Sequence, residues 1–119
     1  FAYCDSGMIP WLLIAGLMSQ TGQSMGELVA AREAAFPCSG EINREVTDPA
    51  ALLAAVEARY APTALAVEKL DGLSVEFAEW RFNLRMSNTE PVVRLNVESR
   101  DDQALMAEKT EELLKLIDA

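Results

Sequence analysis

Histidine is absent from the 119 residues, and cysteine occurs only twice, as Cys4 and Cys38. Without histidine, the chain lacks the commonest general base of enzymes and the commonest zinc ligand. Two cysteines are too few for a disulfide scaffold, and their spacing is not that of a Cys-x-x-Cys pair. We therefore expect two reduced thiols, as in cytoplasmic proteins, and no zinc site.

Basic residues are also scarce, because 10 Lys and Arg stand against 19 Asp and Glu, giving a net charge of -9. Such an excess of acid repels nucleic acids and anionic membranes, so neither is an expected partner. The strongly apolar stretch from Met8 to Met18 is about half as long as a membrane span requires. We interpret it as a helix that is apolar on nearly all sides and must be covered by further structure. We therefore expect the chain to be a piece of a larger protein.

The first third of the sequence predicts two helices, over residues 1 to about 36. Ser24 and Glu27 have the spacing of a capping box at the start of the second helix, and Pro37 ends it. Residues 37–40 are the best candidate for a linker. We therefore predict two domains, a helical segment at residues 1–37 and a second domain at residues 38–119.

The second domain is predicted to be α+β. A short strand near residues 42–46 is followed by a helix that begins at Asp48-Pro49. Two pairs of alternating strands follow, at residues 65–70 and 73–77 around the turn Asp71-Gly72, and at 80–85 and 92–98. A last helix begins at Asp101 or Asp102. The expected order is β-α-β-β-β-β-α, with a four-stranded antiparallel sheet packed on helices.

The connection between the last two strands carries the residues best suited to bind an anion. Alternation along the strands predicts an apolar face and a polar face, and the polar face carries the arginines Arg81, Arg85 and Arg94. An arginine can grip a phosphate with two N–H groups at once. Ser87 and Thr89 add hydroxyl donors. The turn around them can add backbone N–H groups as an anion-binding nest.

Asn88 tolerates the left-handed backbone that such nests use. The alternative is a polar hairpin end without a ligand, since Ser, Asn, Thr and Pro are common turn residues. The acidic residues Glu98, Asp101 and Asp102 could suggest a metal site, but acids gather at helix N-termini in any case.

The segment Arg85-Met86-Ser87-Asn88-Thr89-Glu90-Pro91 resembles the RxSNTEP phosphate-binding loop of the α-D-phosphohexomutases. Further segments resemble the bacterial phosphomannomutase/phosphoglucomutase branch of that family: Phe1–Gly7, Gly40–Asn43, Asp71–Gly72, and Trp80–Phe82 running to Val97–Arg100. The likeness covers essentially the whole chain. It implies that residues 1–37 correspond to the end of the third of four domains. Residues 38–119 would form the fourth, a small domain of TATA-binding-protein-like shape.

In that family this loop closes the active site by holding the phosphate that is not reacting. The resemblance therefore implies Arg85, Ser87, Asn88 and Thr89 as phosphate ligands, whereas Arg94 rests on strand geometry alone. The chain lacks the family's Ser-His-Asn phosphoserine motif and its DGDGDR metal loop. We therefore expect no catalytic residue and no metal ligand in this chain. For the parent enzyme the resemblance implies Mg²⁺, hexose 1,6-bisphosphate and a phosphosugar substrate, with the remaining domains as partners.

Two other functions stay open. The chain could be a stand-alone binding or regulatory module that senses a phosphorylated ligand, or a protein–protein scaffold. An independent module should bury Trp11, Leu13 and Leu17 by itself or in an oligomer. The phosphate site has its own requirement, because it loses its mechanism if Arg85 turns from the loop hydroxyls to an internal carboxylate.

Overall fold

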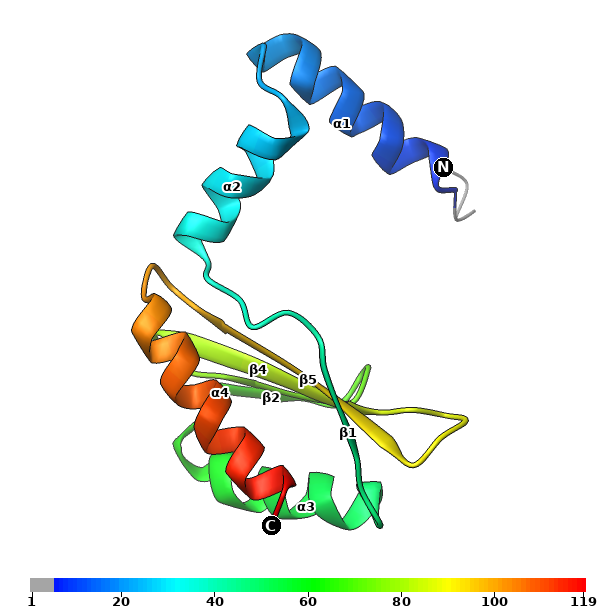
Figure 1. Ribbon diagram of the computed structural model, residues 1–119, viewed down its shortest axis with the longest axis vertical. Coiled ribbons are helices and arrows are strands. Elements are labelled where there is room, and N and C mark those ends of the chain that lie inside the picture. The colour runs from blue at the N-terminus through cyan, green and yellow to red at the C-terminus, as the bar shows by residue number, and fades with distance from the viewer. Residues whose placement is uncertain (1–5) are drawn as a thin grey trace. The chain divides into compact units, whose positions relative to one another are not determined.

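The structure, a computed structural model, describes residues 6–119 in two compact units (Figure 1). The first unit extends to Glu33 and the second begins at Ala34. Of the segment Phe1–Gly7, only Ser6 and Gly7 belong to the described residues, and Cys4 lies outside them. Cys38 is a free, exposed thiol. The correspondence of residues 1–37 and 38–119 to mutase domains stays a prediction.

Two helices form the first part of the described chain, as predicted: α1 (Met8–Thr21) and α2 (Met25–Ala35). Gly22 ends α1 in the left-handed conformation, at a φ of 68°. The predicted capping box is present, since the Ser24 N–H donates to Glu27 Oε2 at 2.8 Å and the Glu27 N–H donates to Ser24 Oγ at 3.3 Å. No residue of α1 or α2 is buried. Across residues 6–119, no helix combines the length and the apolar character needed to cross a membrane.

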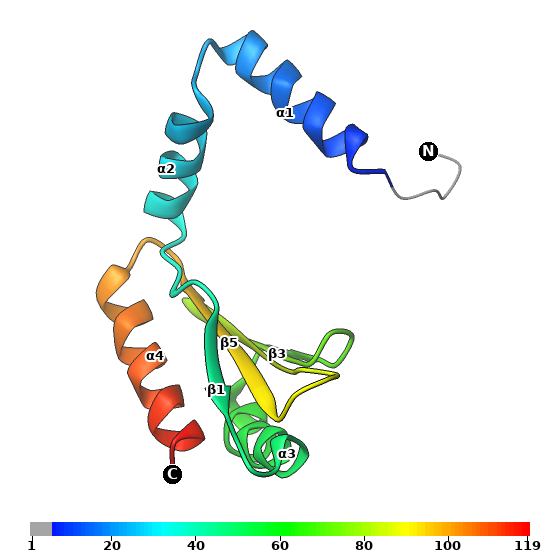
Figure 2. The same cartoon turned by 45° about the vertical axis from the view of Figure 1, so that its right-hand side comes forward.

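The second unit is an antiparallel sheet with helices on one face, which confirms the α+β class (Figures 1 and 2). Its helices are α3 (Pro49–Tyr60) and α4 (Gln103–Ile117), with a short 3₁₀ turn at Ala61–Thr63. The strands lie in the order β1-β5-β4-β3-β2. They are β1 (Ile42–Glu45), β2 (Ala66–Glu68), β3 (Leu73–Glu76), β4 (Trp80–Met86) and β5 (Val92–Ser99). The likeness to the TATA-binding-protein shape stays a prediction.

Two features differ in detail from the expected sheet. The first short strand, β1, joins the same sheet as a fifth strand beside β5, where Ile42 pairs with Leu95. The connection between β2 and β3 is longer than the two-residue turn expected at Asp71-Gly72, because the last ladder pair is Glu68 with Ser74. The first difference comes from a pairing between segments that are distant in the sequence.

The core lies between the sheet and the two helices that cover it. Alternate residues of β3, β4 and β5 point into it, and α3 and α4 supply the rest. The buried residues of this core are Val56, Tyr60, Leu73, Val75, Phe82, Leu84, Val93, Leu95, Val97, Met106, Leu113 and Ile117. Asp48 and Asp102 cap the two helices, and each carboxylate accepts a backbone N–H three residues further on.

Candidate functional site

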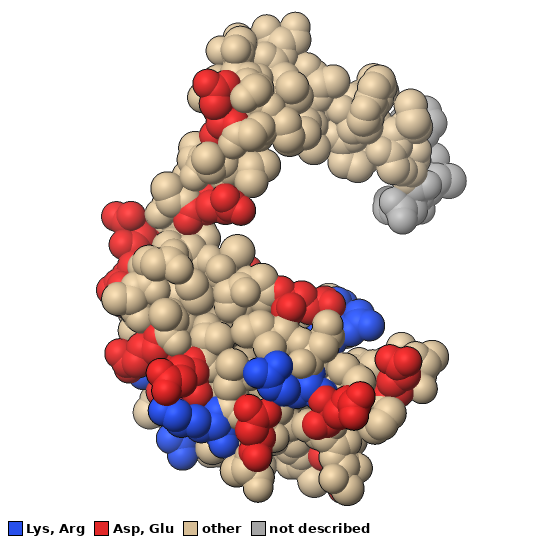
Figure 3. Space-filling model, in the orientation of Figure 1, with Lys and Arg blue, Asp and Glu red and all other residues tan. Residues whose placement is uncertain are grey.

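The face of the sheet opposite α3 and α4 is polar and brings together most of the predicted site. Residues that alternate with the core positions of β4 and β5 point to this face, and they include Arg85 and Arg94. Figure 3 shows acidic and basic side chains intermixed over the visible surface of the second unit. On the side seen in Figure 3, an anion therefore meets basic side chains that lie beside carboxylates.

The predicted phosphate loop connects β4 to β5 and is held at both ends by backbone hydrogen bonds. The Ser87 N–H donates to the Val92 carbonyl at 2.8 Å, and the Val46 N–H donates to the Pro91 carbonyl at 2.9 Å. These bonds fix the exit of the loop against the end of β1. The tip of the loop remains exposed.

The two hydroxyls of the loop lie close together. Ser87 Oγ and Thr89 Oγ1 are 3.4 Å apart, and the Thr89 N–H is directed at Ser87 Oγ over the same distance. The Asn88 N–H donates to no acceptor within residues 6–119. Asn88 does not adopt the left-handed backbone that such nests use. Among the described non-glycine residues, Asp101 alone has a positive φ. The loop therefore offers two adjacent hydroxyls and a free amide.

Arg85 is engaged by carboxylates on both sides. Its Nη2 lies 2.7 Å from Glu41 Oε2, and its Nη1 lies 3.5 Å from Asp71 Oδ2. The hydrogen bond from Arg85 lowers the pKa of the Glu41 carboxyl, and the same bond raises the pKa of Arg85. The Arg85 side chain is 34% exposed, so part of the guanidinium still faces water.

Arg94 lies directly opposite Arg85 in the ladder, and two like charges in such a pair repel each other. Its Nε is 3.9 Å from Glu41 Oε1, so the Glu41 carboxylate faces both guanidinium groups. The Nε atom is buried and has no hydrogen-bond partner in the described part of the chain. Arg81, the third arginine of the polar face, lies at the other end of β4 and pairs with Glu98 at 3.5 Å.

The structure does not meet the requirement predicted for Arg85. Among residues 6–119, Arg85 makes no hydrogen bond to Ser87 or Thr89, and its guanidinium binds Glu41 instead. The strand register brings Arg85, Arg94 and the loop to one end of the hairpin, but the ion pair separates Arg85 from the hydroxyls. Sequence reasoning missed Glu41 because it lies 44 residues before Arg85.

Gly72 brings the β2–β3 connection against Arg85. Its φ is +76°, and a Cβ built there would lie 2.6 Å from both Arg85 Cβ and the Leu84 carbonyl oxygen. The Asn83 amide holds the same connection, because its Nδ2 donates to the Asp71 carbonyl at 2.9 Å. Only glycine fits this contact, which places Asp71 beside the guanidinium of Arg85.

Residues 41–115, well over half of the chain, match the family model described as "Phosphoglucomutase/phosphomannomutase, C-terminal domain". The chain belongs to the phosphoglucomutase/phosphomannomutase family. The matched region includes the whole β4–β5 hairpin and its loop. This finding confirms the resemblance seen in the loop motif.

Individual relatives agree with the family assignment. The chain is 64% identical over 119 residues to a protein named phosphomannomutase from Salmonella montevideo, and 61% identical over 117 residues to one from Escherichia coli. It spans 26% of the length of each of these relatives. A crystal structure of a phosphoglucomutase/phosphomannomutase family protein from Burkholderia thailandensis matches 66% of the chain and 16% of that protein, with a TM-score of 0.50 and 27% identity.

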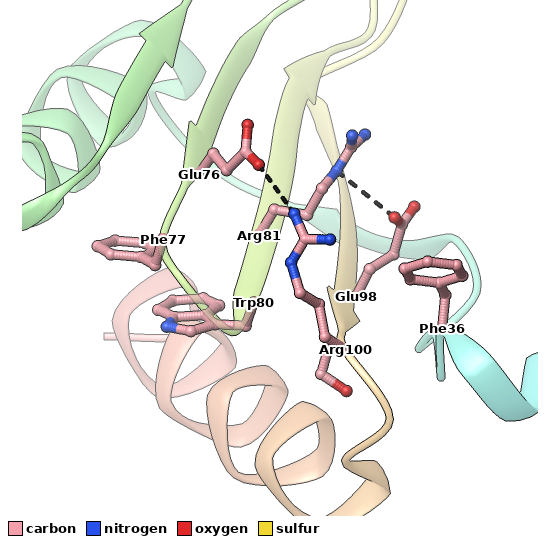
Figure 4. A pocket seen from close by; sticks show the side chains of 8 residues that line it. Phe36, Glu76, Phe77, Trp80, Arg81, Glu98 and Arg100 are labelled. Carbon is pink, nitrogen blue, oxygen red and sulfur yellow. Dashed lines mark hydrogen bonds and ion pairs between the residues drawn. The ribbon is translucent and has the colours of Figure 1, made fainter.

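A hollow lies at the end of the β4–β5 hairpin that is farther from the phosphate loop. It is a pocket of about 180 Å³, and both of its arginines pair with acids, Arg100 with Glu76 at 3.3 Å and Arg81 with Glu98 at 3.5 Å (Figure 4). These pairs use the charges that an anionic ligand would need. Its lining consists of Phe36, Glu76, Phe77, Trp80, Arg81, Glu98, Ser99 and Arg100.

The described residues do not fit a metal ion. Within residues 6–119, no three His, Cys, Asp or Glu side chains come together in a group that could hold one. Of the acids considered from the sequence, Asp102 caps α4 and Glu98 pairs with Arg81. The Mg²⁺ implied for the phosphohexomutases therefore enters no step assigned to this chain.

Proposed function

We propose that this chain is the phosphate-gripping part of a phosphomannomutase/phosphoglucomutase. In this proposal the parent enzyme interconverts hexose 1-phosphate and hexose 6-phosphate, and this part holds the phosphate that is not reacting and closes the active site. The observation that carries the proposal is the exposed β4–β5 loop, where two hydroxyls lie 3.4 Å apart at the end of a strand that carries Arg85.

Such a site suits a substrate that must react at both ends. The hydroxyls, the amide and the guanidinium recognise phosphate and make no demand on the sugar attached to it. The same loop can therefore accept either end of a hexose phosphate. Closure over the phosphate would also exclude water, which otherwise hydrolyses a reactive phosphoryl group.

The proposal requires that the ion pair between Arg85 and Glu41 opens when phosphate binds. Both side chains are exposed enough to exchange partners, at 34% and 40%. Exposed ion pairs contribute little to stability because water screens them. A phosphate dianion carries more charge and more acceptor oxygens than a carboxylate, so it can draw the guanidinium to the loop. Ser87, Asn88 and Thr89 then complete the grip, and Arg94 adds a second positive charge.

The chemistry is assigned to other parts of the parent enzyme. We expect Mg²⁺, a phosphoserine and hexose 1,6-bisphosphate to act there, with the phosphosugar and the remaining domains as partners of this chain. We also place the parent enzyme in the cytoplasm, in keeping with the low cysteine content of this chain. This chain alone is expected to bind a phosphosugar weakly without converting it.

The test is a titration with glucose 6-phosphate, followed by NMR at the amides of Ser87, Asn88 and Thr89. We expect shifts confined to this loop in the wild-type chain. Arg85→Ala should weaken the affinity by roughly tenfold or more, since it removes a charge-assisted hydrogen bond to the dianion. Arg81→Ala is the matched control, because it removes the same charge from the same face at the far end of β4 and should leave the affinity within about twofold.

Unchanged loop signals at millimolar ligand, or equal losses in the two arginine variants, would exclude the loop as the phosphate site. Turnover of glucose 6-phosphate by the chain alone would contradict its separation from the catalytic parts.

A further inference from the structure

The ion pair between Arg85 and Glu41 lies on the wrong side of Arg85 for phosphate binding. In the strand register, Ile42 is opposite Leu95 and Arg85 is opposite Arg94. Glu41 precedes Ile42 on an antiparallel edge strand, so it lies beyond Arg85 as seen from the loop. A guanidinium that binds Glu41 therefore leans away from the loop hydroxyls. This explains the missing hydrogen bonds between Arg85 and the loop.

Glu41 engages the two arginines that a phosphate bound at the loop would need. One carboxylate oxygen accepts from Arg85 Nη2 at 2.7 Å, and the other faces Arg94 Nε at 3.9 Å. That Nε atom is buried and finds no hydrogen-bond partner among residues 6–119. The carboxylate thus satisfies one arginine and only approaches the other. A tetrahedral phosphate has more oxygens with which to reach both.

We propose that Glu41 is an intramolecular competitor of the bound phosphate and sets how tightly the loop grips it. Glu41 holds Arg85 in the free chain, and the phosphate must displace it to recruit the guanidinium. This inference rests on the proposed function of the loop. It goes further by naming the residue that keeps the grip reversible, as a loop that accepts either end of a hexose phosphate requires.

The charges around Arg85 indicate that Glu41 and a bound phosphate compete for this arginine. Glu41 and Asp71 face its guanidinium from two sides, and a phosphate dianion at the loop would bring two further negative charges to the same guanidinium. Negative charges around one guanidinium repel each other, so the phosphate and Glu41 compete for Arg85. Removal of its charge frees Arg85 and also lowers the repulsion, and both effects act in the same direction.

The test compares the affinity of the chain for inorganic phosphate across four variants. Glu41→Gln keeps the shape of the side chain and removes its charge, and we expect it to tighten phosphate binding by about threefold to tenfold. Glu98→Gln is the matched control, since it removes the charge of another acid on the same face, and that acid pairs with Arg81 instead of Arg85. It should change the affinity by less than about twofold. The NMR signal of the Arg85 side-chain N–H should also shift in Glu41→Gln before phosphate is added.

The remaining two variants, Arg85→Ala and the double variant with Glu41→Gln, close a double-mutant cycle. If Glu41 acts through Arg85, the gain from Glu41→Gln disappears in the Arg85→Ala background. Unchanged or weaker binding by Glu41→Gln overturns the inference, and so does a gain that survives without Arg85. If Arg85→Ala binds phosphate as well as the wild type, the proposed function of the loop fails and this inference fails with it.

Discussion

At the scale of single residues, the candidate site depends on a glycine as much as on its arginines. Gly72 lies against the backbone and Cβ of the Arg85 strand, where no side chain fits. This contact places the β2–β3 connection, with Asp71, beside the guanidinium. The site therefore has a steric requirement outside the phosphate-loop motif.

Substitution of Gly72 tests that requirement. Gly72→Ala combines a positive φ with a clash at 2.6 Å, so we expect a loss of about 3 kcal/mol in the free energy of unfolding. Gly40→Ala is the control, because Gly40 has a φ of +68° but open space around it, and we expect a loss of about 1 kcal/mol. Urea denaturation measures both, and equal losses would show that the contact with Arg85 is unimportant.

For the Arg85–Glu41 pair, the sequence predicts the face on which Arg85 lies but not its partner. Alternation along β4 and β5 correctly puts Arg85 and Arg94 on the polar face, because a strand has a fixed period of two. It cannot name the partner of Arg85, which lies 44 residues earlier, just before the edge strand β1. Once β1 is placed beside β5, the same alternation puts Glu41 on the polar face, so the missing information was the strand pairing.

At the scale of elements, the predicted helix starts held because their causes are local. The capping box at Ser24 and the start of α3 at Asp48-Pro49 depend on residues within one helical turn, and both are present. The addition of β1 to the sheet depends on a pairing with β5 that local pattern does not encode. The β2–β3 connection also differs from the local prediction, and it carries Gly72, which lies against β4.

A polar contact between α3 and α4 gives the folded chain a distinct pH dependence. The Tyr60 hydroxyl donates to Glu112 Oε1 at 2.9 Å, and Glu112 also accepts from Lys109 at 2.9 Å. Burial, with the hydrogen bond to Glu112, raises the pKa of Tyr60 to about 12. Since the folded form holds its proton more tightly than the unfolded form, this contribution is complete below pH 10 and is lost as the pH rises to 12.

We therefore expect the free energy of unfolding to fall by about 2 kcal/mol more in the wild type than in Tyr60→Phe between pH 10 and pH 12. The pKa of Lys109 is also raised, by its bonds to Glu112 and Glu108, but Lys109 is present in both proteins and cancels in the comparison. Denaturation at several pH values measures the difference. Parallel curves for the two proteins would show that Tyr60 does not titrate with folding.

At the scale of the whole molecule, the two units differ in how far they bury their own apolar residues. The second unit has a closed core between its sheet and its helices. In α1 no residue is buried, and Trp11, Leu13 and Leu17 are 60%, 68% and 46% exposed. The chain spans 26% of the length of its Salmonella and Escherichia relatives. The exposure of α1 therefore favours a part of a larger enzyme over a self-sufficient module.

The exposed helix makes the last prediction, because apolar surface of this kind associates in water. We expect the chain to bind an apolar fluorescent dye and to scatter more light as its concentration rises. Leu13→Glu should lower both signals severalfold, since it places a charge in the apolar surface of α1. Leu70→Glu, at an isolated position that is 97% exposed in the second unit, is the matched control and should leave them unchanged. A single oligomer of fixed size that binds no dye would instead support the stand-alone module, since that oligomer would cover α1 by itself.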